Sequence, residues 1–155
     1  MTTRTAPTPM LDEQLCFALY AASRRITAAY RLLLDPLGLT YPQYLAMLVL
    51  WEADRTSVRA LGARLQLDSG TLSPLLKRLE QAGLLRRERR RSDEREVEIS
   101  LTPAGRKLRS RAADTPREIT RRLRLSAAAC ARLREELHSL AASLSAPTPQ
   151  RRDHP

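Results

Sequence analysis

The spacing of apolar residues changes at Gly83, from a helical period on its N-terminal side to an alternating period on its C-terminal side. Leucines between Leu72 and Leu79 recur at spacings of three and four, which is typical of one face of a helix. From Val97 to Leu101 every second residue is apolar, which is typical of a strand with one buried face. The chain must therefore place helices directly before a β-hairpin, and few architectures satisfy that order.

Two short helices are expected in front of this hairpin. Ser57 is a good N-cap for the first, whose apolar residues are Val58, Leu61 and Leu65. A turn at residues 67–70 separates it from the second helix. Two short helices joined in this way form a helix-turn-helix, a motif whose second helix enters the major groove of DNA.

The start of the second helix has two interpretations. Pro74 has no backbone N–H and fits best at the first helical position, directly after a Ser73 cap. Asp68 or Ser69 would instead cap an earlier start, with Pro74 tolerated as a slight kink. The end is better defined, because Gly83 suits the left-handed backbone of a helix C-cap.

The hairpin that follows completes a winged helix. Leu84 and Leu85 lead into its first, charged strand, and its tip is expected at residues 91–95. The sequence therefore predicts a mainly α fold, a winged helix-turn-helix with a small β-hairpin as the wing.

Near the N-terminus a long amphipathic helix is expected from Leu11 to about Pro36. Thr40 and Gln43 follow as a capping-box pattern, in which each side chain accepts a hydrogen bond from the backbone N–H of the other residue. This pattern predicts a further helix over residues 41–53.

Two more helices are expected after the hairpin. Thr102 and Pro103 combine an N-cap with a proline at the first helical position, and they predict a helix that continues into the 120s. Ser126 then caps a last helix that reaches about Leu144.

The length of 155 residues is sufficient for one domain with a substantial core. We expect a single domain over residues 10–145, with disordered tails over residues 1–9 and 146–155. No stretch approaches the ~18 apolar residues of a transmembrane helix, and the first nine residues lack the pattern of a signal peptide. A cytoplasmic location and no membrane partner are therefore expected.

The chain carries 27 lysine and arginine residues against 17 acidic ones, a formal net charge of +10. Only Lys77 and Lys107 are lysines, so nearly all of this charge is arginine. A positive field of this size attracts polyanions, and together with a winged helix it favours double-stranded DNA as the partner.

Two surfaces of the predicted winged helix carry residues that can contact DNA. The second helix offers a polar face, whose hydroxyls can read base edges and whose cations can bind phosphates. Five arginines lie within residues 86–91, and an arginine at a hairpin tip suits the narrow minor groove of A·T-rich DNA. The candidate DNA-binding residues are Ser69, Thr71, Ser73, Lys77, Arg78, Asp93 and Arg95.

Cys16 and Cys130 are the only cysteines. A standing disulfide is not expected in the cytoplasm, and no Cys/His cluster has the spacing of a metal site. The sequence also lacks a Ser/His/Asp set and a glycine-rich phosphate loop. Neither an enzyme nor a bound metal or cofactor is therefore indicated.

Four segments carry a more specific resemblance: LDEQLCF (11–17), LTYPQY (39–44), LDSGTLSPLLKRLE (67–80) and DER (93–95). They are similar to the MarR-family organic hydroperoxide resistance regulators (OhrR), and the likeness extends over about residues 10–145. The resemblance implies a homodimeric winged-helix repressor in which the N- and C-terminal helices form the dimer interface. It also implies that an organic hydroperoxide oxidises an N-terminal cysteine and that the dimer then leaves its near-palindromic operator.

The resemblance further implies roles for individual residues. Cys16 matches the peroxide-reactive cysteine, and Tyr30 and Tyr41 match two tyrosines that hydrogen-bond its sulfur from the neighbouring subunit. Phenol donors and a helix N-terminus can stabilise the thiolate that attacks a peroxide. Cys130 would resolve oxidised Cys16 as an intersubunit disulfide, although a small external thiol or a merely packed Cys130 are alternatives.

Other functions fit parts of the same sequence. A MarR-type repressor could respond to a small aromatic ligand in its dimer cleft, with Cys16 only packed. A thiol peroxidase would use a reactive cysteine but has no need of a winged helix or a large positive charge. A non-specific architectural DNA binder is a third alternative.

Overall fold

The computed structural model describes residues 10–90 and 93–145, and the side chains in these ranges except at residues 90, 93–95 and 145. The chain divides after Thr115 into two compact units, and a single domain over residues 10–145 stays a prediction. The tails expected at residues 1–9 and 146–155 lie outside the described residues.

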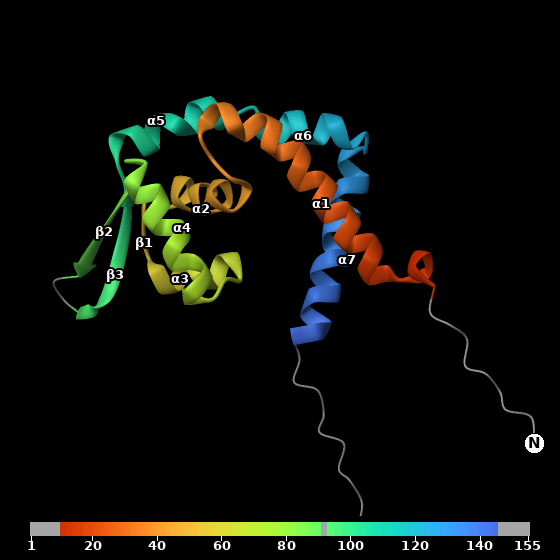
Figure 1. Ribbon diagram of the computed structural model, residues 1–155, viewed down its shortest axis with the longest axis horizontal. Helices are drawn as coiled ribbons and strands as arrows, with labels where there is room; N and C mark the ends of the chain where they lie inside the picture. Colours follow the sequence, from red (N-terminus) through yellow and green to blue (C-terminus); the bar gives the residue numbers. More distant parts are fainter. Residues whose placement is uncertain (1–9, 91–92, 146–155) are drawn as a thin grey trace, which may run out of the picture. The chain divides into compact units, whose positions relative to one another are not determined.

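The first unit (Figure 1) contains η1 (Leu11–Glu13), α1 (Leu15–Leu34), η2 (Asp35–Leu37), α2 (Tyr41–Glu52), β1 (Arg55–Ser57), α3 (Val58–Leu65), α4 (Ser69–Gln81), β2 (Leu85–Arg90), β3 (Asp93–Leu101) and α5 (Pro103–Ala112). The second contains α6 (Thr115–Leu123) and α7 (Ala127–Ser145).

The long N-terminal helix is slightly shorter than predicted. A 3-10 turn, η1, precedes α1, so the α-helix begins at Leu15 and not at Leu11. It ends at Leu34, and Pro36 lies in the short turn η2. Gly38 then adopts a left-handed backbone with φ of 69°, which glycine tolerates without steric cost. This turn directs the chain from α1 into α2.

α2 begins with the predicted capping box. The backbone N–H of Thr40 donates to Gln43 Oε1 at 2.8 Å, and the backbone N–H of Gln43 donates to Thr40 Oγ1 at 3.5 Å. The helix packs against α1, α3, α4 and α5, and it forms the centre of the core of the first unit. Its buried residues are Tyr44, Ala46, Met47, Val49, Leu50 and Trp51.

The helix-turn-helix is present, and its second helix has the earlier of the two starts. Ser57 caps α3 by accepting a backbone N–H at 3.1 Å. Asp68 caps α4, because its Oδ1 accepts the backbone N–H of Thr71 at 2.9 Å. The start after Ser73 is therefore wrong, and Pro74 lies inside α4, where it costs one backbone hydrogen bond.

The wing is a three-stranded antiparallel sheet in the order β1-β3-β2, one strand more than the predicted hairpin. Gly83, with φ of 70°, ends α4 as predicted and directs the chain into β2. β1 pairs with β3, with Thr56 opposite Ile99. The sequence carries no signal for β1, because its three residues are too few to show alternation. β3 begins at Asp93, inside the segment where the tip is expected.

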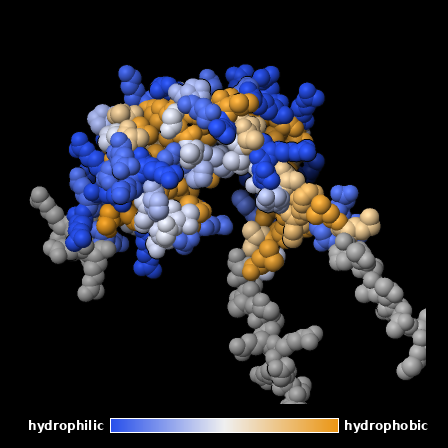
Figure 2. All heavy atoms as spheres, viewed as in Figure 1, coloured by the Kyte–Doolittle hydropathy of each residue, from blue (hydrophilic) through white to orange (hydrophobic). Residues whose placement is uncertain are grey.

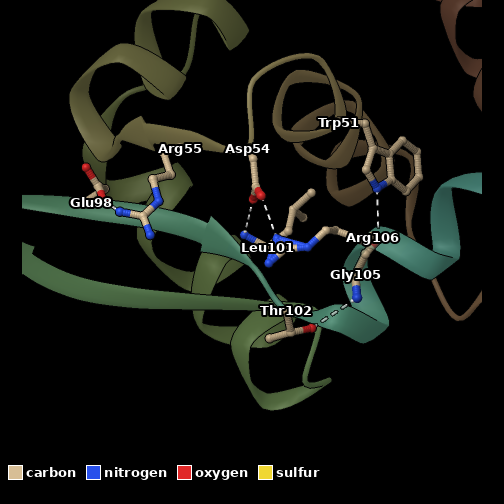
Figure 3. Close-up of polar contacts among 8 residues, drawn as sticks. All are labelled: Trp51, Asp54, Arg55, Glu98, Leu101, Thr102, Gly105 and Arg106. Atoms are coloured by element: carbon tan, nitrogen blue, oxygen red, sulfur yellow. Dashed lines mark hydrogen bonds and ion pairs between the residues drawn. The ribbon is translucent and has the colours of Figure 1, made fainter.

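Polar contacts join α2, the wing and α5 (Figure 3). The Asp54 carboxylate accepts the backbone N–H of Leu101 at 2.9 Å and pairs with a guanidinium of α5. Trp51 Nε1 donates to the carbonyl oxygen of Gly105 at 2.9 Å. Thr102 caps α5 as predicted, since its hydroxyl oxygen accepts the Gly105 N–H at 3.0 Å. These bonds fix α5 and β3 on the central helix.

The helix after the wing is interrupted. α5 ends at Ala112 and α6 begins at Thr115, so the prediction of one helix into the 120s is wrong. Pro116 explains the break, because it has no N–H for the Ala112 carbonyl and its ring would clash with that carbonyl. In the second unit Ser126 caps α7 as predicted, with its Oγ accepting the Ala129 N–H at 3.1 Å.

Gly105 generates a testable prediction about packing. A Cβ at this position would overlap the carbonyl oxygen of Leu84, a backbone atom that cannot move aside alone. We expect Gly105→Ala to lower the free energy of unfolding by about 2 kcal/mol or more, the cost of overpacking. Urea unfolding followed by the fluorescence of Trp51, the only tryptophan, measures this change.

A matched control is Ala104→Ser, a change of similar size at an exposed neighbour. It is expected to stay within about 0.5 kcal/mol of the wild type. A Gly105→Ala variant as stable as this control would contradict the close approach of α5 to Leu84.

Candidate functional site

The polar residues of α4 gather beside the first strand of the wing. Ser69, Ser73 and Lys77 are exposed and spaced four residues apart, so they share one face of the helix. With Arg87 of β2 they line an open surface hollow. The hollow brings two hydroxyls and two cations together on the second helix of the helix-turn-helix.

Thr71 and Arg78 are exposed on α4 but do not line this hollow. The Thr71 hydroxyl donates to Asp68 Oδ2 at 2.8 Å, in addition to the backbone hydrogen bond of the cap. These hydrogen bonds from Thr71 hold the pKa of the Asp68 carboxyl below its ordinary value. Thr71 therefore has a structural role in the first turn of α4.

Arg87 has a partner that the sequence does not reveal. Its Nε and Nη2 donate to Glu80 Oε2 at 2.9 and 2.7 Å, and its backbone N–H donates to Glu80 Oε1 at 3.0 Å. Hydrogen bonding by Arg87 holds the pKa of the Glu80 carboxyl below its usual range. In the sequence Arg87 is one of five arginines in residues 86–91, and only the chain reversal at Gly83 indicates that it can face α4.

The remaining DNA-binding candidates lie at the hairpin tip. The side chains of Asp93 and Arg95 lie outside the described residues. Arg86 and Arg89, further down β2, are exposed.

Within the described parts of the chain, no group of three or more His, Cys, Asp or Glu residues could hold a metal ion. None of the described helices combines the length and apolar character needed to cross a membrane.

Three tyrosines form a cluster where α1 meets α2. The ring centroids of Tyr30 and Tyr41 are 4.6 Å apart, and those of Tyr30 and Tyr44 are 5.8 Å apart. Burial raises the pKa of Tyr30 to about 12, with smaller effects of Tyr41 and Tyr44. Burial also raises the pKa of Tyr41. Both phenols therefore keep their protons at neutral pH and are hydrogen-bond donors.

Cys16 is an exposed, free thiol in the first turn of α1. The first turn of a helix stabilises nearby negative charge. Tyr30 lies fourteen residues further along the same helix, which at ~1.5 Å per residue is a separation of about 21 Å. The structure thus brings Tyr30 and Tyr41 together, but it does not bring them to Cys16 of the same chain.

Cys130 lies in the second unit, near the start of α7, and is half-buried and free. It belongs to a surface hollow within that unit. The other residues of the hollow are Leu123, Leu125, Leu133, Arg134, Leu137 and His138. The surroundings of this thiol are therefore mainly apolar.

Hydrophobic side chains are exposed on both α1 and α7 (Figure 2). On α1, Leu15 is 62% exposed and Tyr20 is 57% exposed, and on α7 Leu133 is 46% exposed. Large apolar side chains exposed on a helix are typical of a surface that packs against another element or another molecule.

Comparison with known proteins relates this chain to transcriptional regulators. Residues 28–111 match the family described as transcriptional regulator SarA/Rot. The organic hydroperoxide resistance transcriptional regulator of Bacillus subtilis is 48% identical over 134 residues, which cover 86% of this chain and 91% of that protein. The chain belongs to the MarR-family organic hydroperoxide resistance regulators.

Two structures of AbfR, a protein of Staphylococcus epidermidis, are also similar. Reduced AbfR bound to DNA has 37% identity and a TM-score of 0.74, over 86% of this chain and 94% of that one. Disulfide-formed AbfR has 36% identity and a TM-score of 0.67, over 86% and 91%. As a family member, this OhrR-type protein is a DNA-binding transcriptional regulator with a winged-helix fold, and its relatives are regulators, not enzymes.

The two lysines of this regulator allow a matched test of the DNA interface, because only Lys77 lines the hollow on α4. We expect Lys77→Ala to weaken binding to any duplex, and to lower the slope of log affinity against log salt by about 0.9 per chain, since one phosphate contact is lost. Lys107→Ala removes the same charge from an exposed site on α5. Fluorescence anisotropy over a salt series measures DNA binding by both variants. If the two variants have the same slope, Lys77 does not contact the phosphates.

Proposed function

We propose that this regulator is a homodimeric repressor that senses organic hydroperoxides through Cys16 and then releases a near-palindromic operator. The observation that carries this proposal is the separation of the free Cys16 thiol from the phenols of Tyr30 and Tyr41. At about 21 Å along one continuous helix, a thiol cannot be hydrogen-bonded by Tyr30 of its own chain. A second chain is needed to complete the site.

The exposed apolar residues on α1 and α7 support such a dimer. Leu15, Tyr20 and Leu133 are large apolar or aromatic side chains that these helices expose, and an interface would cover them. In the proposed two-fold dimer these helices form the interface, and the two copies of α4 are presented to DNA about one helical turn apart. The expected operator is therefore near-palindromic. The operator is part of the DNA of the cell, and we therefore propose that the regulator is located in the cytoplasm.

The chemistry begins with the thiolate of Cys16, which phenol donors would hold in place. Its sulfur attacks the terminal oxygen of the hydroperoxide, and an S–O bond forms as the O–O bond breaks. The alkoxide takes a proton from water and leaves as an alcohol. Sulfur loses the two electrons that the peroxide gains, and Cys16 becomes a sulfenic acid.

Cys130 of the other chain is the proposed resolving residue. Its thiolate attacks the sulfenic sulfur, an S–S bond forms, and hydroxide leaves. The similarity to AbfR, whose structures include a reduced form bound to DNA and a disulfide form, supports this sequence of states.

Oxidation would replace the charged thiolate that accepts from the Tyr30 and Tyr41 hydroxyls with a neutral sulfur, and so weaken these hydrogen bonds. Tyr41 is the first residue of α2, and α2 packs directly against α4. A shift of α2 can therefore change the spacing of the two DNA-binding helices. A differential stability of a few kcal/mol between the two arrangements is enough to empty an operator.

The first test measures operator release. Reduced protein is titrated against an A·T-rich palindromic duplex from upstream of its own gene, before and after addition of cumene hydroperoxide. We expect the wild type to dissociate on oxidation and Cys16→Ser to stay bound. Cys130→Ser should dissociate without forming an intersubunit disulfide on a non-reducing gel. If Cys16→Ser dissociates like the wild type, the thiol is not the sensor and a small-ligand response becomes the better account.

A second test concerns the phenols. We expect Tyr30→Phe and Tyr41→Phe each to slow oxidation of Cys16 by cumene hydroperoxide about tenfold, because a hydrogen bond to a charged group contributes roughly 1.5–3 kcal/mol. The rate is followed as loss of free thiol in a Cys130→Ser background. Tyr44→Phe is the matched control, since Tyr44 belongs to the same cluster but is only 1% exposed. Unchanged rates in all three variants would exclude the phenols from the sensing site.

A further inference from the structure

Arg87 occupies an unusual position for a cation. It lies opposite Ile99 in the β2–β3 ladder, so its side chain is on the face of the sheet that carries the buried Ile99. Leu85, two residues earlier on the same face, is also buried. An apolar side chain would also pack at this position, so the stability of the fold does not require an arginine there.

The side chain of Arg87 lines two adjoining surface hollows, which share Ser69 and Ser73 of α4. It lines the hollow that contains Ser69, Ser73 and Lys77. It also lines a second hollow between α3, α4 and β3, to which Val58 and Val97 contribute. Arg87 is 31% exposed, which is typical of an arginine whose stem is buried and whose guanidinium reaches water.

Glu80 determines where this guanidinium points. The carboxylate accepts three hydrogen bonds from Arg87, two from the side chain and one from the backbone. The bond to the backbone fixes β2 on α4, and the bonds to Nε and Nη2 fix the plane of the guanidinium. Because the pair is neutral overall, its contribution is local geometry and not the general attraction of the protein for DNA.

A guanidinium has five N–H donors, and Glu80 accepts from two of those of Arg87. The others can bind a further oxyanion, and arginine is well suited to bind phosphate while it is held by a carboxylate. The neighbouring Ser69, Ser73 and Lys77 offer the additional donors that a phosphate requires.

We propose that Arg87 binds a phosphate of the DNA backbone beside α4, and that Glu80 is the positioning residue that aims it there. The pair couples the helix to the wing, so that both meet the duplex at a fixed angle. This inference rests on the DNA binding of the family and not on peroxide sensing.

The alternative is an ion pair that only stabilises the fold, and three variants distinguish the two. Arg87→Gln removes the cation, Arg87→Lys keeps the charge without the planar fork, and Glu80→Gln keeps the cation but weakens its orientation. Glu118→Gln is the matched control, because Glu118 is also a carboxylate paired with arginines, Arg121 and Arg122, but on α6. Urea unfolding of every variant accompanies the binding measurements.

Binding of the reduced full-length protein is measured by anisotropy, over a salt series, with the upstream palindromic duplex and a scrambled duplex. For Arg87→Gln we expect about tenfold weaker binding to both, and a slope of log affinity against log salt smaller by about 0.9 per chain. Arg87→Lys and Glu80→Gln should bind several-fold more weakly with the wild-type slope. Glu118→Gln should match the wild type.

Two results would overturn the proposal. A wild-type salt slope for Arg87→Gln would exclude a phosphate contact. Tighter binding by Glu80→Gln would show that Glu80 only repels DNA and does not position Arg87. No oxidant is used and phosphates are present on any duplex, so the scrambled duplex tests Arg87 even if peroxide-dependent release fails.

Discussion

The burial of α2 is the constraint on which the rest of the first unit depends. This helix contacts α1, α3, α4 and α5, and half of its residues are buried. Its first turn carries Tyr41 and Tyr44 into the aromatic cluster, and its last turn carries Trp51 to the backbone of α5. The proposed sensing residues and the DNA-binding helix are therefore connected through one packed element. Closely packed interiors transmit displacement because they have few voids to absorb it.

The capped helix starts could be predicted from sequence, because each depends on contacts between residues close in the chain. Thr40, Ser57, Thr102 and Ser126 all accept a backbone N–H three residues later, and all four caps are present in the structure. The start of α4 is ambiguous in the sequence, because Pro74 is compatible with an early cap at Asp68 or Ser69 and with a later cap at Ser73. The structure selects Asp68, whose side chain accepts the backbone N–H of Thr71. The winged-helix class followed from the change of period, which reflects burial of one face.

Long-range contacts could not be predicted in this way. β1 exists only because β3 offers it a partner, and the Glu80–Arg87 pair forms only because the turn at Gly83 reverses the chain. For the candidate site, the resemblance indicates Cys16 and the tyrosines, and the predicted long helix already places Cys16 and Tyr30 far apart along α1. The close packing of Tyr30 with Tyr41 and Tyr44 is seen only in the structure. The sequence shows which side chains could take part. It does not show which side chains from different helices pack together.

The small strand β1 has a consequence for the behaviour of the protein at high concentration. β3 is nine residues long, and with β2 alone it would present an open edge of unpaired N–H and C=O groups. Such edges promote strand addition between molecules and lead to aggregation. β1 covers this edge at Ser100, Ile99 and Glu98, and is itself only three residues long. The inner part of the wing is thereby protected from self-association, while its outer part keeps its length for DNA.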